Sequence, residues 1–117
     1  MDKHITKTNE LLLNLVVELK KTSTAKKAKI WKAIALELLK PTRKMREVNI
    51  DKINRVTKPN DIIVVPGKVL GKGNVDHNVT VAAFNFSESA KQKLKDNLSI
   101  HELMKKHPKG TGVKIIG

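Results

Sequence analysis

The chain of 117 residues has no cysteine and no tyrosine, a single tryptophan and only two phenylalanines. The absence of cysteine excludes disulfides and cysteine metal sites, and it agrees with a cytoplasmic protein. So few aromatic side chains predict an aliphatic core and leave almost nothing for recognition of RNA by base stacking. A long apolar run, a basic amphipathic terminus and a signal peptide are also missing, so we expect no membrane partner.

Acidic residues are scarce as well. The 11 Asp and Glu stand against 24 Lys and Arg, which gives a formal net charge of +13 and a pI near 10.1. Self-repulsion of that size disfavours a solitary compact protein, so a polyanionic partner is the natural explanation, and nucleic acid fits best. Residues 1–60 carry +9 of the charge and residues 61–117 carry +4. We therefore expect the first half to supply the main contact surface.

Patterns that would indicate an enzyme or a metal site are missing too. The four histidines form no HxH, HxxxH or HExxH pair; they are His4, His77, His101 and His107. Asp76 and His77 suggest acid–base work, but no nucleophile pattern accompanies them, so a solvated loop or a polar contact to RNA is preferred. We expect no catalysis, no cofactor, no metal and no small-molecule substrate.

The segment from Asp61 to Ser87 is the most informative part of the chain. Its β-branched run at 62–65 is typical of a strand buried on both faces. Pro66-Gly67 is expected to break that strand, since proline donates no N–H and glycine tolerates strained backbone angles. Residues 68–70 resume it, a glycine turn follows at 71–74, and 79–84 forms a second strand. Lys68 and Lys72 then flank a glycine loop and are free to reach an anion.

This glycine loop does not match a nucleotide-binding loop. A Walker loop needs GxxxxGK followed by Ser or Thr, but Gly67 and Gly71 are one residue too close and Gly73 replaces the hydroxyl. A dinucleotide fingerprint beginning at Gly71 would need a third glycine where Asp76 stands. Both motifs must also open a helix, whereas this loop leads into a strand.

Two helices are predicted in the N-terminal part, over about 8–21 and 24–40, with Thr22-Ser23-Thr24 as the break between them. The second has an apolar face that includes Trp31, which we expect in the core. Its opposite face carries Lys26, Lys29, Lys32 and Lys40, with only Glu37 to offset them. A lysine face is often merely solvated, but helices that serve solubility usually interleave both signs. We therefore predict phosphate contacts by Lys26, Lys29 and Lys32.

Pro41 ends the second helix, and a basic segment follows it. Arg43, Lys44 and Arg46 include two of the three arginines of the chain, whose planar forks suit bidentate phosphate contact. Asn49 is a candidate cap for a short helix over 50–57, with Ile50, Ile53 and Val56 expected to face inward.

The remaining elements are predicted from their caps. Ser87 or Ser89 should cap a helix that reaches about Asn97, under which Phe84 and Phe86 share one buried face. Ser99 and Glu102 form a capping box for a helix that stops near Pro108. This helix should direct Leu103 and Met104 inward, and a last strand is predicted over 113–116.

The motifs PGKVLGKG and VTVAAFNFSESAKQKL, at this spacing, resemble the archaeal and eukaryotic large-subunit ribosomal protein L-eighteen-e family. That family shares a superfamily with the bacterial-type large-subunit protein L-fifteen. The likeness covers nearly the whole chain, from about Thr8 through Trp31 to the final strand. One departure is Asp96-Asn97, where family members usually carry a glycine pair, which leaves the turn geometry there open.

The sequence therefore predicts one small α/β domain, with a basic helical part over 1–42 and an α/β core over 43–117. The resemblance implies that the core is an irregular β-β-α superhelix with short strands. It also implies a structural role in the cytoplasmic ribosome, bound to large-subunit ribosomal RNA and to neighbouring ribosomal proteins. The compact length resembles archaeal members. The alternative from another class is a free nucleic-acid-binding regulator that uses the lysine-rich second helix.

Overall fold

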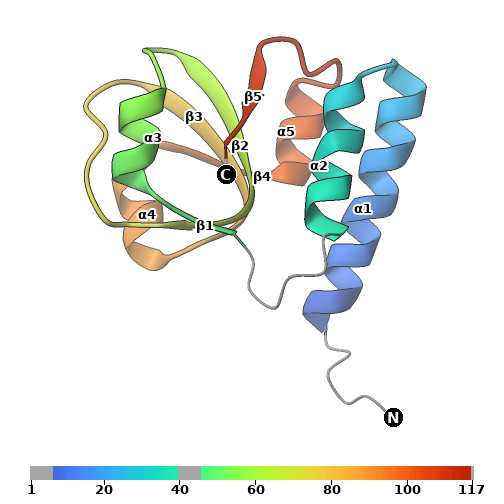
Figure 1. The fold of residues 1–117 in the computed structure, drawn as a ribbon, viewed down its shortest axis with the longest axis horizontal. Coiled ribbons are helices and arrows are strands. Elements are labelled where there is room, and N and C mark those ends of the chain that lie inside the picture. Colours follow the sequence, from blue (N-terminus) through green and yellow to red (C-terminus); the bar gives the residue numbers. More distant parts are fainter. Residues whose placement is uncertain (1–6, 40–45, 117) are drawn as a thin grey trace.

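The computed structural model describes residues 7–39 and 46–116, except for the side chains of residues 7–9 and Leu11. Five helices and five strands alternate along this part of the chain (Figure 1). The helices are α1 (Lys7–Lys26), α2 (Lys29–Leu39), α3 (Ile50–Val56), α4 (Glu88–Lys93) and α5 (Ile100–Lys106). The strands are β1 (Arg46–Asn49), β2 (Asp61–Leu70), β3 (Val79–Phe86), β4 (Asp96–Ser99) and β5 (Val113–Ile115). The predicted fold class, a single small α/β domain with two helices first, is confirmed.

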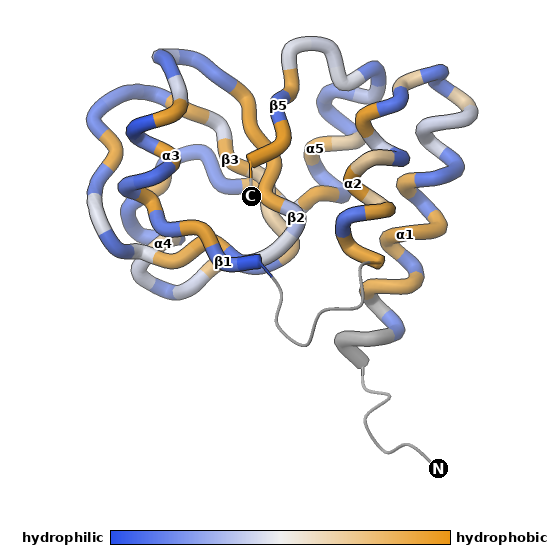
Figure 2. The backbone as a smooth tube through the Cα atoms, in the orientation of Figure 1, coloured by the Kyte–Doolittle hydropathy of each residue, from blue (hydrophilic) through white to orange (hydrophobic). Residues whose placement is uncertain are grey.

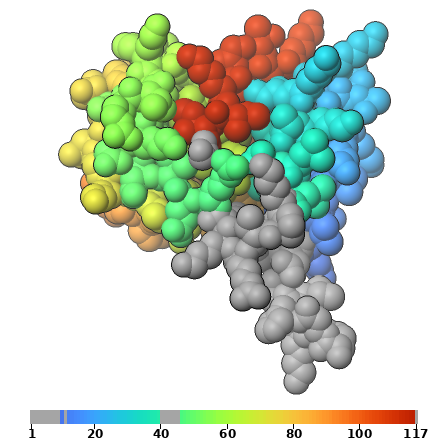
Figure 3. All heavy atoms as spheres, in the orientation of Figure 1, coloured from blue at the N-terminus to red at the C-terminus, as the bar shows by residue number. Residues whose placement is uncertain are grey.

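All strand pairs between the described elements are parallel. The order is β1-β2-β3-β4, and β5 joins the free edge of β2 beside β1. β1 pairs with the carboxyl half of β2, from Gly67 to Leu70, and β5 pairs with the amino half, from Ile62 to Val64. The chain thus advances strand by strand across the sheet. The C-terminal segment lies between the helical hairpin and the β1–α3 region, and Figure 3 shows it filling that space.

The sheet separates two hydrophobic clusters. Ile63 and Val65 belong to one cluster while Val64 between them belongs to the other, because successive side chains of a strand point to opposite faces. The helical face carries α1, α2 and α5, whereas α3 and α4 lie on the face that we call the loop face. Burial on both sides explains the uninterrupted apolar run of β2, which Figure 2 shows as a hydrophobic strand in the middle of the molecule.

Large side chains fill the cluster on the helical face. Trp31 and Ile34 from α2, Leu19 from α1 and Leu103 from α5 are all fully buried. The indole Nε1 of Trp31 donates a hydrogen bond of 2.7 Å to the Pro108 carbonyl, so its polar atom is satisfied inside the core. The predictions that Trp31 is a core residue and that Leu103 and Met104 face inward are confirmed.

The predicted boundary between the first two helices is wrong. α1 continues through Thr22, Ser23 and Thr24 and ends only at Lys26. The break comes at Lys27, whose φ of 52° is left-handed, and at Ala28, which is buried. Threonine and serine disfavour helix interiors only mildly, and Thr22 and Ser23 are half-buried here, so tertiary packing overrides the local signal.

The predicted break of β2 at Pro66-Gly67 is also wrong, since the strand runs from Asp61 to Leu70. The two residues leave a register shift against β3 between Val65 and Lys68, so they disturb the pairing without ending it. Gly67 lies opposite Arg46 of β1, and a Cβ at this position would overlap the Arg46 carbonyl oxygen. The glycine is therefore explained by close approach of a neighbouring strand.

Two short strands were not predicted. β1 occupies the end of the basic segment, and β4 begins at Asp96, where the sequence predicted the last turn of a helix. α4 stops at Lys93, and the side-chain amide of Asn97 donates to the Leu94 carbonyl at 2.9 Å. The Asp96-Asn97 departure thus needs no left-handed residue, because Asn97 helps to satisfy the end of α4.

Caps and inward faces agree with the sequence only in part. Ser87 caps α4, and Ser99 and Glu102 form the predicted capping box of α5. Asn49 precedes α3 but its side chain makes no capping hydrogen bond. Val56 is 48% exposed, so its predicted inward position is wrong.

The prediction of one shared face for the two phenylalanines is also wrong. Phe84 packs against the cluster of the helical face and Phe86 against that of the loop face, although both are partly buried. The two residues stand at the end of β3, beyond the register shift, where simple alternation no longer predicts the side.

A candidate nucleic-acid interface

The predicted lysines of the helical part surround the α1–α2 turn. Lys26 ends α1, Lys29 begins α2 and Lys32 follows one turn later, and all three side chains are exposed. Lys26 therefore belongs to α1, which corrects its predicted place on the second helix. The three cations still lie near one end of the hairpin, because the two helices are antiparallel and joined by a tight turn (Figure 1).

Further basic residues join this end of the hairpin, and sequence reasoning missed them. Lys105, in the last turn of α5, lines the same surface cavity as Lys26, and Pro108 lines it too. The loop after α5 is tied to α2 by the Trp31 hydrogen bond to Pro108 and by Gly110, where a Cβ would overlap Ile30. The basic last turn of α5 was a visible signal, but its neighbour in space was not.

The basic segment after α2 is described only in part. Arg43 and Lys44 lie outside the described residues. Arg46 is exposed, and its guanidinium forms an ion pair of 2.7 Å with the Glu37 carboxylate of α2. The acid that partly offset the lysines of α2 is therefore paired with Arg46. Any contact of Arg46 with phosphate would have to share or replace this ion pair.

Lys68 and Lys72 differ in their surroundings. Lys68 lies inside β2, opposite Glu47 of β1 and Asn85 of β3, and is half-buried. Lys72 lies in the loop 71–78 that follows β2, and its side chain is exposed. The predicted placement of both lysines beside the loop is thus right only for Lys72.

The loop 71–78 is held between α3 and α4. The Lys72 carbonyl accepts a hydrogen bond from the Asp51 amide at 3.0 Å, and the Asp76 amide donates to Asn54 Oδ1 at 3.0 Å. A Cβ at Gly71 would overlap Ser89 of α4, and one at Gly73, with φ of +100°, would lie 2.5 Å from the Asp51 Cβ. These glycines are required by contacts within the protein.

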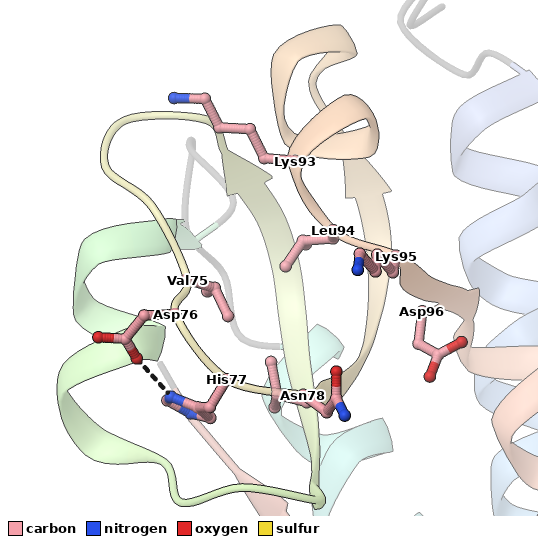
Figure 4. Close-up of a pocket in the computed structure, with 9 residues that line it drawn as sticks. Val75, Asp76, His77, Asn78, Lys93, Leu94, Lys95 and Asp96 are labelled. Carbon is pink, nitrogen blue, oxygen red and sulfur yellow. Dashed lines mark hydrogen bonds and ion pairs between the residues drawn. The ribbon is translucent and has the colours of Figure 1, made fainter.

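A surface cavity of about 220 Å³ opens between the end of this loop and the start of β4 (Figure 4). His77 borders it, with Nδ1 at 2.9 Å from Asp76 Oδ1 and Nε2 at 2.7 Å from Thr57 Oγ1. The hydrogen bond to His77 lowers the pKa of Asp76 from its usual 3.8. Thr57 is buried and also donates to the Ile53 carbonyl, so these hydrogen bonds tie the loop to the end of α3.

Two other kinds of site are absent from the described ranges. No cluster of three or more histidine or acidic side chains with the proximity of a metal site occurs within residues 7–39 and 46–116. No helix in the same ranges combines the length and the apolar character needed to cross a bilayer. What the geometry presents is a basic surface in two places: at the α1–α2 turn with the end of α5, and at the loop 71–78.

The fold and this surface define a class: a small α/β protein that displays many cations from helix ends and from one rigid loop. Comparison with known proteins narrows the class. Residues 26–97 match the family described as the ribosomal proteins 50S-L15 and 50S-L18e and their 60S counterpart. The chain belongs to this family, which confirms the resemblance inferred from its motifs.

Relatives from archaea are similar over nearly the full chain. The large ribosomal subunit protein eL18 of Methanoregula boonei is 48% identical over 120 residues, covering 99% of each chain. The protein of the same name from Archaeoglobus fulgidus is 43% identical over 114 residues, covering 94% of this chain and 97% of its own. A third, from Sulfurisphaera tokodaii, is 60% identical over 68 residues, or 58% of each chain.

Proposed function

We propose that this protein is a structural component of the large ribosomal subunit in the cytoplasm and binds large-subunit ribosomal RNA. The observation that carries the proposal is similarity over 99% of the chain to a large ribosomal subunit protein. The charge of +13 supports it independently, because so basic a small protein is stabilised by a polyanion. The archaeal relatives support an archaeal type of ribosome.

The mechanism we propose is neutralisation of phosphates with release of their counterions. Double-stranded RNA offers shape, phosphates and 2′-hydroxyls more readily than base edges, so lysines on a rigid fold are suited to position it. The proposed contacts are those predicted from the sequence: Lys26, Lys29, Lys32, Arg43, Lys44, Arg46, Lys68 and Lys72. We add Lys105, since it borders the same cavity as Lys26.

The two basic places lie far apart, at opposite ends of the view in Figure 1. We infer that they contact different RNA segments, so that the protein fixes the position of one relative to the other. Neighbouring ribosomal proteins are proposed as further partners. Exposed apolar side chains on α1 and α2 are the candidate contacts for them; these are Leu13, Val17, Leu36 and Leu39.

The first experiment is sedimentation of a cell lysate at low and high salt. We expect about one copy of the protein per large subunit, retained at salt concentrations that remove adventitious basic proteins. Recovery of most of the protein free, or in equal amounts on both subunits, would contradict the proposal.

The second experiment tests the phosphate contacts. Single alanine variants at Lys29 and Lys32 are titrated against a large-subunit RNA fragment and a shuffled duplex at several salt concentrations. Removal of one phosphate contact should flatten the slope of log affinity against log salt by roughly 0.7 to 0.9. The control is Lys58→Ala, an exposed lysine in the turn between α3 and β2.

The same titration separates a structural role from a sequence-reading one. A residue that reads bases should cost roughly 1–3 kcal/mol on substitution and relax preference at one position. If Lys29→Ala changed the preference between RNAs and left the salt slope unchanged, a free regulator that reads sequence through α2 would become the better explanation.

A further inference from the structure

The lysines around α4 are alike in the sequence but not in their contacts. Lys91 and Lys95 have exposed side chains, as the amphipathic pattern predicts. The Lys93 ammonium, also exposed, reaches back to the loop 71–78, where it donates to the Gly71 carbonyl at 2.7 Å and to the Gly73 carbonyl at 2.8 Å. Figure 4 shows Lys93 extending from α4 toward that loop and away from the cavity beneath.

With Lys93, three consecutive carbonyls of the loop are held by the protein. Gly71 and Gly73 accept from Lys93, and Lys72 between them accepts from the Asp51 amide. A charged donor makes a stronger hydrogen bond than a neutral one, and one ammonium bridging two carbonyls fixes the curvature of the turn. The Lys72 side chain, by contrast, is left exposed.

The surrounding contacts leave this turn little freedom to move toward either helix. Gly71 lies against Ser89 of α4, and Gly73 lies against Asp51 of α3. Lys93 opposes the remaining motion, away from the gap between the helices, because that motion would break both of its hydrogen bonds. The exposed ammonium contributes little to stability, since water can replace its partners, so its main consequence is the shape of the loop.

We propose that Lys93 is a positioning residue, which fixes the turn at 71–73 so that the Lys72 ammonium meets a ribosomal RNA phosphate at a set place. The inference rests on the proposed function. It divides the basic residues into two kinds: lysines that contact phosphate, and Lys93, which is engaged within the protein and acts through Lys72. A preorganised contact is stronger because less ordering remains to be done on binding.

The test is a double-mutant cycle on affinity for a large-subunit RNA fragment at several salt concentrations. The variants are Lys93→Met, Lys72→Met and the double variant, with Lys91→Met as the matched control on the same helix. Removal of one phosphate contact corresponds to roughly a fivefold weaker affinity at about 0.15 M salt. We expect Lys93→Met to approach that loss in the wild-type background and to cost under about twofold in the Lys72→Met background.

The control and the conservative variant sharpen the result. Lys91→Met should have the same effect in both backgrounds, since it only lowers the local charge. Lys93→Arg should restore affinity and salt slope, because a guanidinium can also donate to two carbonyls. Amide hydrogen exchange in the free protein should be faster at residues 71–73 in Lys93→Met than in Lys91→Met.

Additive effects of Lys93→Met and Lys72→Met, each flattening the salt slope, would make Lys93 a phosphate contact itself and overturn the inference. Equal behaviour of Lys93→Met and Lys91→Met would overturn it as well. If no variant, Lys29→Ala included, altered the affinity for RNA while exchange in the loop still rose, the proposed function would be the part that fails.

Discussion

The two faces of the sheet display their cations by different means. On the helical face, Lys29 and Lys32 project from α2, whose position is fixed by large buried side chains such as Trp31. On the loop face, Lys72 projects from a loop whose course is fixed by hydrogen bonds from α3 and α4. Cations on a helix keep their spacing as long as the helix packs. The position of Lys72 depends on single polar contacts and on glycines that permit close approach.

The comparison is tested most strongly by removing the anchor of the helical face. Trp31→Ala should lower the free energy of unfolding by about 3–5 kcal/mol, because it leaves a large cavity and deprives the Pro108 carbonyl of its donor. The measurement is urea unfolding. Leu36→Ala, at a side chain that is 51% exposed, is the control and should change stability by less than about 0.5 kcal/mol. Similar losses for the two variants would show that α2 is not held by its buried face.

A substitution at Gly71 tests the loop face in the same way. Gly71→Ala should cost about 1–3 kcal/mol, since the added Cβ would overlap Ser89 and lie 2.9 Å from the Ala90 amide nitrogen. Thermal unfolding measures the loss. Gly112→Ala is the control: its φ of +77° strains an alanine, but nothing lies within 4 Å of the new Cβ. Partial recovery in Gly71→Ala/Ser89→Gly would confirm the overlap, and no loss in Gly71→Ala would refute tight packing of the loop.

Helix caps compare the two faces at equal chemistry. Ser99→Ala removes the capping box of α5 on the helical face, and Ser87→Ala removes the cap of α4 on the loop face. Each should cost about 0.5–2 kcal/mol, since an amide loses its acceptor. We expect the larger loss at Ser99, where two hydrogen bonds connect Ser99 and Glu102. Chemical denaturation of both variants decides, and a larger loss at Ser87 would contradict this order.

The smallest expected effect is a dependence on pH. The hydrogen bond from the Ser99 amide lowers the pKa of Glu102 from its usual 4.5. A carboxyl with a lowered folded-state pKa stabilises the fold above its unfolded value, and this contribution is lost as the pH falls through the folded value. Stability should therefore decline below about pH 4.5 in the wild type and less steeply in Glu102→Gln. Equal acid unfolding curves would contradict the role given to this carboxylate.

Much of the molecule could be predicted from the sequence, because it depends on local patterns. Apolar periodicity identified the core face of α2 with Trp31, and the β-branched run identified β2 as a strand buried on both sides. Ser99 and Glu102 marked the start of α5. The motifs around the glycine loop were specific enough to indicate the family. Hydrophobic burial and capping act over a few residues, so the sequence alone determined these features and the positive charge.

The tertiary structure alone decided where α1 ends, how β2 passes through Pro66-Gly67, and which strands pair. Each depends on a neighbour distant in the chain: the packed hairpin for Thr22–Thr24, and Arg46 for Gly67. The same holds for the basic residues. Nothing local distinguishes Lys93 from Lys91, because the carbonyls that Lys93 binds lie 20 and 22 residues away. Hydrogen bonds over such separations form only when the whole fold brings their partners together, so they leave no pattern in the sequence.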